Sequence, residues 1–309
     1  MIIQFCEKKK MKSKVKDIIL LTLIYFGLLG FFSILISNNE NIVISYSDNI
    51  FNPRTSEISS KIHIKNNWTA AKAADICTGD GTSSNPYIIS DLEINAGSSG
   101  SCILIEDSNV YFKVINCTLN GSGSELTDAG LKLINVEKAQ ILNNTFSGNE
   151  NGIYMEFCVN CLIVNNSFIN NLDLKLMSST DALIYLNSFK GGTLDFFIYN
   201  STFNCKSPQI FIYKYNETTH YNYLGNYWSG YTGDDNNYDG IGDTANIYYN
   251  SHVLHVDYYP LIRPIEFYEI LGTSEIDVYP IPGYELLIFL GIILITSLII
   301  IPRKLSFQK

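Results

Sequence analysis

A repeat of about 22 residues runs through the middle of this 309-residue chain and limits the folds open to it. The first apolar residues of four copies, Leu131, Ile153, Leu174 and Phe196, are spaced by 22, 21 and 22 positions. Within each copy apolar and polar residues alternate over short runs, which is typical of half-buried β-strands. This period is too short for a propeller blade of roughly 40 residues, and it fits one turn of a parallel β-helix.

Two further positions recur in the copies and predict ladders along the stack. Asparagines stand at 144, 166 and 187, and aromatic residues follow two positions later at 146, 168 and 189, with Phe211 as a weaker fourth member. Like residues of successive coils lie above one another, so we expect the asparagines to form a hydrogen-bonded amide ladder at a turn. The stretch from Pro86 to Asn226 has room for about six coils, whose ends need caps.

Two apolar runs, residues 18–36 and 286–301, lie near the ends of the chain beside basic residues. A helix of about 20 apolar residues crosses a bilayer, but the first run also has the layout of a secretory signal peptide. Lys and Arg outside the runs predict cytoplasmic termini and an outer middle segment. The predicted order is a basic tail (1–17), a transmembrane helix or signal peptide (18–37), a linker (38–67), the β-helix with its carboxyl-terminal cap (68–264), a linker (265–284), a transmembrane helix (285–302) and a basic tail (303–309).

Charge is divided unevenly among these segments. The formal net charge of the chain is −9, yet residues 38–284 hold 27 acidic against 12 basic residues. A general nucleic-acid binder normally presents a basic face, which so acidic a segment does not favour. We therefore expect no nucleic-acid partner and consider cations the partners to test first.

Cysteines and glycosylation sequons agree with an outer location for the middle segment. Six of the seven cysteines lie between the apolar runs, an even number compatible with disulfides. The candidate disulfide residues are Cys77, Cys102, Cys158 and Cys161, although spacing alone does not establish their pairing. A redox or zinc role for the CxxC pair is weaker, because no second Cys/His pair has metal spacing. Asn-x-Ser/Thr sequons occur at Asn67, Asn116, Asn120, Asn143, Asn165, Asn200 and Asn216.

An acidic loop near the end of the repeat region is the candidate metal site. Its candidate calcium ligands are Asp235, Asn237, Asp239, Ile241 (through its backbone carbonyl) and Asp243. Oxygens at alternate positions, followed by Gly240 for a sharp turn, match the first nine positions of a calcium loop. The twelfth position holds Asn246 where an acidic ligand is usual. The alternative is an Asp- and Gly-rich turn that caps the last coil.

Carboxylates and aromatic residues supply the other candidate site residues. Asp173 and Asp195 occupy equivalent positions in successive coils, so about 5 Å would separate them, and two opposed carboxylates are what glycoside hydrolysis needs. Solvated turn residues are the simpler interpretation. Tyr227, Trp228 and Tyr231 suit stacking on sugar rings, or they plug the open end of the helix.

The two ends of the repeat region carry more specific signatures. Cys77–Ile89 reads CTGDGTSSNPYII, and Gly225–Leu261 begins with GNYWSGY and continues through DGIGD to DYYPL. Together with the coils, these stretches resemble the right-handed parallel β-helix family typified by the periplasmic copper-maturation protein NosD and by the carbohydrate-binding and sugar-hydrolase module. The resemblance implies an all-β fold, a right-handed parallel β-helix, here flanked by the two predicted transmembrane helices. Separately, Pro280–Tyr284 resembles the motif of archaeal carboxyl-terminal sorting signals, which implies a trimmed, lipid-anchored tail.

These observations predict a membrane-anchored extracytoplasmic β-helix protein that binds glycans or other surface partners at the cell envelope. A carbohydrate-active enzyme, either a polysaccharide lyase or a glycoside hydrolase, is the first alternative. A NosD-like copper-maturation factor is the second. It is disfavoured because His252 and His255, three apart on a strand, would point to opposite faces.

Overall fold

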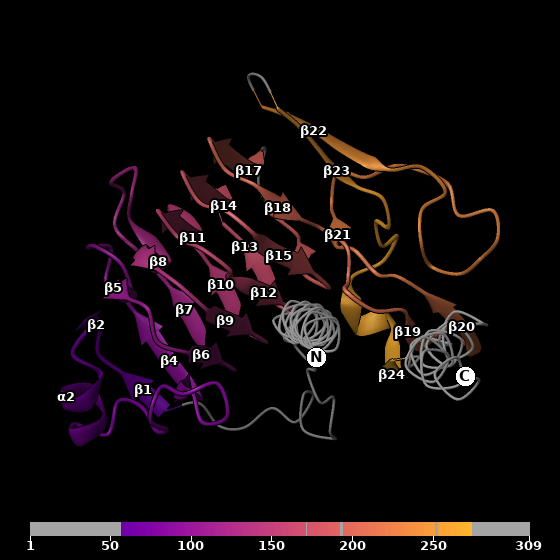
Figure 1. Cartoon of the computed structure of the whole chain (residues 1–309). Coiled ribbons are helices and arrows are strands. Elements are labelled where there is room, and N and C mark those ends of the chain that lie inside the picture. Colours follow the sequence, from indigo (N-terminus) through magenta and orange to yellow (C-terminus); the bar gives the residue numbers. More distant parts are fainter. Residues whose placement is uncertain (1–56, 171, 192–193, 251–252, 274–309) are drawn as a thin grey trace, which may run out of the picture. The chain divides into compact units, whose positions relative to one another are not determined.

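The structure, a computed structural model, describes residues 57–170, 172–191, 194–250 and 253–273. Nearly all regular structure in these residues is β-strand, and the strands recur in the same order from coil to coil (Figure 1). They build three parallel sheets, A, B and C, each of which receives one strand from each successive coil. The result is a parallel β-solenoid of about 5 turns. It confirms the predicted all-β architecture, although the sequence predicted about six coils.

The elements have the following bounds. Sheet A contains β1 (Glu57–Ser59), β4 (Leu92–Asn95), β7 (Thr118–Asn120), β10 (Thr145–Ser147), β13 (Ser167–Ile169), β16 (Ser188–Phe189) and β21 (Tyr227–Trp228). Sheet B contains β2 (Ile62–Lys65), β5 (Ile103–Ser108), β8 (Ala129–Val136), β11 (Asn151–Glu156), β14 (Leu172–Met177) and β17 (Leu194–Tyr199). Sheet C contains β3 (Tyr87–Ser90), β6 (Phe112–Ile115), β9 (Ala139–Leu142), β12 (Leu162–Val164), β15 (Ala182–Tyr185) and β18 (Phe203–Asn204). Outside these sheets lie α2 (Trp68–Ala73), β19 (Phe211–Tyr215), β20 (Thr218–Asn222), β22 (Asn246–Asn250), β23 (Val253–Asp257), η1 (Ile265–Phe267) and β24 (Glu269–Thr273).

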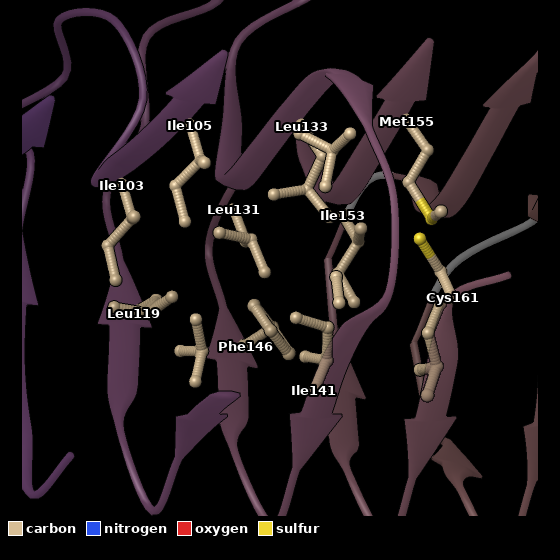
Figure 2. Packing of buried hydrophobic residues seen from close by; sticks show 14 of the residues in the cluster. Ile103, Ile105, Leu119, Leu131, Leu133, Ile141, Phe146, Ile153, Met155 and Cys161 are labelled. Carbon is tan, nitrogen blue, oxygen red and sulfur yellow. The ribbon is translucent and has the colours of Figure 1, made fainter. Parts of the chain in front are cut away.

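The 22-residue repeat is one turn of this solenoid. Leu131, Ile153, Leu174 and Phe196 are direct neighbours across β8, β11, β14 and β17. Most inward-facing residues of the three sheets are buried and pack into one core, part of which Figure 2 shows. Burying each such aliphatic side chain contributes about 1.5–3 kcal/mol, so stacking successive coils is what stabilises strands of only two to eight residues.

The predicted amide ladder is present and buried. The Oδ1 of Asn166 accepts hydrogen bonds from the backbone N and the Nδ2 of Asn144, at 2.8 and 3.0 Å. Asn187 accepts in the same way from Asn166, at 2.9 and 3.0 Å. The ladder then continues beyond its predicted members, through Asn226 to the Oδ2 of Asp257. Every amide donates toward the carboxyl end, so the last member must be an acceptor, which a carboxylate is.

An aromatic stack runs beside the amide ladder. The rings of Phe146, Phe168 and Phe189 follow one another with centroids 4.9 Å apart. The fourth ring is Trp228, 4.4 Å from Phe189, and not Phe211 as the sequence predicted. Phe211 lies in the antiparallel hairpin β19–β20, because the chain leaves the stack after β18 and rejoins sheet A at β21.

Both ends of the solenoid are covered by aromatic residues. At the amino end, Trp68 of α2 stacks on Tyr87 with ring centroids 4.9 Å apart, and its indole N–H donates to Ser108. At the carboxyl end, Trp228 covers Phe189. The stack begins before Trp68, because β1 and β2 lie within the segment 38–67 that the sequence assigned to a linker.

The membrane predictions fall outside the residues whose structure is described. Across 57–170, 172–191, 194–250 and 253–273, no helix has the length and apolar character needed to cross a bilayer. The predicted spans 18–37 and 285–302, and the sorting motif at 280–284, lie beyond these ranges.

Candidate functional site

The outward-facing side of sheet B carries a line of side chains in register, which we call the outer row. It consists of His63, Leu104, Lys132, Tyr154, Lys175 and Phe197, one from each strand between β2 and β17. These positions alternate with buried ones, as Lys132 does with Leu131 and Leu133. Neighbouring strands of a sheet lie about 4.8 Å apart, so side chains along the outer row contact one another.

Lysines and aromatic rings alternate in the carboxyl-terminal half of the outer row. The Nζ of Lys132 lies 5.3 Å from the Tyr154 ring centroid, and the Nζ of Lys175 lies 5.5 Å from that ring and 5.4 Å from the Phe197 ring. Such cation–π contacts are worth about 0.5–1 kcal/mol at exposed sites. Burial raises the pKa of Tyr154 to about 12, so its hydroxyl stays protonated and donates to Glu156 at 3.1 Å. Tyr154 is 3% exposed and Phe197 40%, so the row ends in an accessible ring.

The segment between β7 and β8, residues 121–128, borders the outer row. The backbone oxygen of Leu126 accepts a hydrogen bond from the Nζ of Lys175 at 2.8 Å. The hydroxyl of Thr127 accepts one from the Nζ of Lys132, also at 2.8 Å. An ammonium group has three donors, so these contacts position both lysines and leave donors for a bound molecule.

Exposed aromatic rings stand at the carboxyl ends of β11 and β17, two strands apart in sheet B. Phe157 is 57% exposed and Tyr199 59%. Phe157 has a φ of +55°, whereas the aligned positive-φ positions of the other coils hold Asn66, Asp107, Asn135, Ser178 and Asn200. A bulky residue in the left-handed region costs about 1–3 kcal/mol, and an exposed ring recovers little of that cost by burial. Phe157 is thus an exposed aromatic ring at a turn position where the other coils have Asn, Asp or Ser.

The aromatic residues predicted to bind glycans lie in the carboxyl-terminal cap. Trp228 is 1% exposed, and its indole N–H donates to the Oδ2 of Asp257 at 2.9 Å. Tyr231 packs against the core and donates to the backbone oxygen of Thr244. Tyr227 is half-buried. Trp228 and Tyr231 therefore lie where the plug interpretation puts them, and sugar binding at Tyr227, Trp228 and Tyr231 stays a prediction.

The acidic loop folds into a turn whose side chains bind its own backbone. The two oxygens of Asp235 accept from the backbone N–H groups of Asp239 and Gly240, at 3.1 and 3.0 Å. Asp239 accepts from the N–H of Ile241 at 2.8 Å, and Asn237 also accepts from Asp239. Both the backbone N and the Nδ2 of Asn236 donate to the carboxylate of Asp243. These contacts fit the capping-turn alternative, and calcium binding stays a prediction.

Calcium binding at this loop has a direct test in thermal unfolding. With a dissociation constant of about 0.1–1 mM, which is usual for extracellular sites, 2 mM Ca²⁺ would stabilise the chelated protein by about 0.6–2 kcal/mol. We expect Asp243→Asn to abolish this stabilisation by Ca²⁺. The amide oxygen of the variant can still accept hydrogen bonds from Asn236. Equal midpoints with and without Ca²⁺, in a control at matched ionic strength, would leave the loop a capping turn only.

Of the two carboxylates predicted as catalytic candidates, the structure describes the side chain of Asp173 but not that of Asp195. Asp173 is fully buried, and its Oδ1 accepts from the backbone N and the Nδ2 of Asn170 at 3.1 and 3.2 Å. It ends a second amide ladder, in which Asn170 accepts from Asn149. The backbone of Asp195 lies in β17 beside β14, but its side chain lies outside the described residues. Asp173 thus stabilises the fold by accepting hydrogen bonds from Asn170. Its pairing with Asp195 stays a prediction.

Glycines explain why Asp173 turns inward. Gly130 and Gly152 occupy the equivalent position in the two preceding coils, and a Cβ there would lie 3.0 and 2.8 Å from the Nδ2 of the nearest ladder asparagine. The next coil has glycine, Gly191, where an asparagine would continue the ladder. The side chain of Asp173 takes the place of that missing asparagine, and its Oδ1 is the acceptor for Asn170.

The six cysteines of the described part are buried free thiols. The predicted disulfide residues Cys77 and Cys102 are therefore unbonded in the structure. Cys158 and Cys161 are unbonded too, but they lie close enough for the Cys161 thiol to donate to the Cys158 sulfur, which lowers the pKa of Cys158 and raises that of Cys161. Both belong to the turn between β11 and β12.

Histidine and carboxylate groups do not gather into a metal site in the residues that the structure describes. Those residues contain no group of three or more His, Cys, Asp or Glu side chains that could hold a metal ion. His63 is exposed and pairs with Glu106 at 2.7 Å. His252 and the side chain of His255 lie outside the described residues.

Sequence reasoning missed the outer row, although its signal is in the repeat. The alternation places Lys132 and Tyr154 outside, and the same offset in the next two copies gives Lys175 and Phe197. The outward positions of successive copies therefore predict the row, as the inward positions predict the core. The exposure of Phe157 has no such signal, because only the backbone shows its turn position.

Comparisons with known proteins identify the family to which this chain belongs. Residues 30–233 match the family model described as periplasmic copper-binding protein (NosD). No curated protein matches the chain. Among solved structures, the complex of XylC with xylose is 14% identical, with a TM-score of 0.31, and the match covers 45% of this chain and 26% of that one. This chain thus matches about a quarter of that protein's length. Because the family model spans well over half of the sequence, the chain belongs to the NosD family.

Proposed function

We propose that this chain is an extracytoplasmic β-helix protein, tethered to the membrane by its apolar segments, that binds glycans through the outer face of sheet B. The family description, a periplasmic protein, supports the extracytoplasmic location. The apolar runs and the basic residues beside them support the tether. Anchoring of this kind would hold the solenoid at the envelope, where glycans are abundant ligands.

The observation that carries glycan binding is the alternation of lysines and rings on one sheet face. Lys175 lies between Tyr154 and Phe197, and the accessible ring of Tyr199 lies two residues further along β17. Exposed apolar side chains scattered singly are ordinary on protein surfaces. Here the exposed rings lie on the same sheet as the ammonium groups of Lys132 and Lys175. Segment 121–128 holds both ammonium groups by hydrogen bonds.

The chemistry of these side chains suits a sugar chain. Aromatic rings stack on the C–H faces of sugars while their edges leave polar groups free. Lysine ammonium groups donate to hydroxyl or carboxylate oxygens. The outer row places these groups at regular intervals of about 4.8 Å along the stack, so an extended chain could contact several coils at once.

Glycan binding is testable with a glycan array and titration of the best ligand into the full-length protein. We expect Phe197→Ala and Tyr199→Ala each to weaken binding about 10- to 30-fold, because each loses about 1.4–2 kcal/mol of ring burial. Lys175→Ala should weaken binding to acidic glycans more than to neutral ones, since it removes a charge.

Exposed aromatic residues elsewhere supply matched controls. Tyr221 is 65% exposed on β20, and Phe267 is 55% exposed in η1. Alanine at either position should leave the affinity unchanged. An array without any ligand, or equal losses from the sheet B variants and these controls, would rule out the outer row as the binding face.

A further inference from the structure

One of the Asn-x-Ser/Thr sequons differs from all the others in its exposure. The structure describes each of the seven sequons of the chain. In six of them one residue is buried, and this residue is Trp68, Cys117, Ser122, Asn144, Asn166 or Ser201. In the seventh, Asn216–Thr218, all three residues are exposed.

Three of the other sequon asparagines are stacked in successive coils of the solenoid. The Nδ2 of Asn143 donates to the Oδ1 of Asn116, and the Nδ2 of Asn165 donates to the Oδ1 of Asn143, both at 3.4 Å. The Nδ2 of Asn116 donates to Asp91 at 2.6 Å. A sugar attached to any of these nitrogens would replace a hydrogen and would have to fit between coils about 4.8 Å apart. These three asparagines are therefore poor acceptors.

Two further sequons have an exposed asparagine but are held by the fold. The Oδ1 of Asn67 accepts a hydrogen bond from the backbone N of Lys65 at 2.8 Å. The hydroxyl that belongs to the sequon of Asn200 is that of Thr202, which accepts from the backbone N of Asp181 at 3.1 Å. In the folded protein the groups of these sequons are thus already engaged.

The exposed sequon lies at the tip of an antiparallel hairpin. Tyr215 at the end of β19 pairs with Thr218 at the start of β20, so Asn216 and Glu217 form a two-residue loop. Their φ angles are +47° and +67°. Positive φ at both positions is typical of a type I′ turn, for which asparagine is one of the favoured residues. The turn thus presents the Asn216 amide and the Thr218 hydroxyl to solvent without any change in the solenoid.

We infer that Asn216 is an acceptor site for N-linked glycosylation. The sequon supplies the amide and the hydroxyl two residues further on that this modification requires. The donor class is a sugar chain carried on a polyprenyl phosphate. Transfer forms a bond between the Nδ2 of Asn216 and C1 of the first sugar and breaks the bond from C1 to the phosphate oxygen. The Nδ2 loses one proton, the lipid phosphate leaves, and nothing is oxidised or reduced.

The position of the hairpin separates this modification from the glycan-binding face. Strands β19 and β20 form an antiparallel sheet with β24, whereas the outer row belongs to sheet B. A sugar chain on Asn216 would therefore leave the outer row uncovered. The inference rests on the extracytoplasmic location proposed above, but it does not rest on glycan binding.

The test is peptide mapping by mass spectrometry of the full-length protein, purified from the envelope of the cells that produce it. We expect the peptide that contains Asn216 to carry the added mass of a sugar chain. The peptides that contain Asn116, Asn143 and Asn165 should be unmodified. Thr218→Ala removes the sequon hydroxyl and should abolish the added mass, whereas Thr218→Ser keeps a hydroxyl and should retain it.

Asn216→Gly gives a second, independent loss of the acceptor. Glycine adopts positive φ without strain, so the hairpin should fold while the added mass disappears. Circular dichroism of each variant separates lost modification from lost folding. An unmodified Asn216 in the wild type, or an added mass that persists in both Thr218→Ala and Asn216→Gly, would overturn the site. Either result leaves glycan binding on sheet B untouched.

Discussion

Replacing Asn166 with alanine is expected to lower the free energy of unfolding by about 3–5 kcal/mol. The side chain lies in the middle of the main amide ladder and is fully buried. Its Nδ2 donates to the backbone oxygens of Ile141 and Val164, and its Oδ1 accepts two hydrogen bonds from Asn144. Each buried polar group left without a partner costs about 1–3 kcal/mol, and several are left at once. Urea denaturation followed by circular dichroism measures the change.

The neighbouring residue provides the control for this substitution. Asn165 precedes Asn166, is half-buried, and has a φ of +56°, so Asn165→Gly should change stability by less than about 1 kcal/mol. Asn166→Asp retains the volume and the acceptor but loses both donors, and at pH 7 it should be at least as harmful as alanine. A loss below about 1 kcal/mol for Asn166→Ala would show that the ladder contributes little to stability.

The pH dependence of stability is expected to carry a large contribution from Asp257. Burial raises the pKa of this carboxyl to about 6 from an ordinary value of 3.8, although Asn226, Trp228 and Tyr259 donate hydrogen bonds that oppose the shift. Between about pH 4 and 6 the folded state keeps a proton that the unfolded state has lost. The free energy of unfolding therefore falls by about 3 kcal/mol as pH rises through this window.

Asp257→Asn isolates this contribution because an amide does not titrate in that range. Denaturation at pH 4, 5, 6 and 7 measures the free energy of unfolding. Between pH 4 and pH 7 this free energy should fall by about 3 kcal/mol more in the wild type than in the variant. The contribution is fully present below about pH 4 and absent above the folded pKa of about 6. Parallel curves for the two proteins would mean that Asp257 titrates normally, and an opposite slope would mean that its hydrogen bonds outweigh its burial.

The repeated part of the fold was predictable because equivalent residues of every coil occupy the same position in the core. Leu131, Ile153 and Leu174 recur at one spacing since each fills the same place in the core, one coil apart. The asparagines at 144, 166 and 187 recur because the turn that they stabilise is repeated. Period and chemistry agree at these positions, so the sequence alone predicts their alignment.

The ends of the stack were not predictable in this way, because the chain leaves the repeat there. Asp257 ends the ladder 31 residues after Asn226, and no period links the two. Trp228 replaces Phe211 as the fourth stacked ring because the hairpin β19–β20 is inserted between coils. Asp173 looked like a surface carboxylate, yet a missing ladder asparagine in the next coil draws its side chain into the core.

The most direct test of sheet B as the binding face is a crystal structure of the full-length protein with its tightest glycan from the array. The account predicts a sugar ring stacked on Phe197 or Tyr199, with Lys132 or Lys175 within hydrogen-bonding distance of its oxygens. A glycan bound instead at the carboxyl-terminal cap, against Tyr227 or the loop at Asp235, would contradict it.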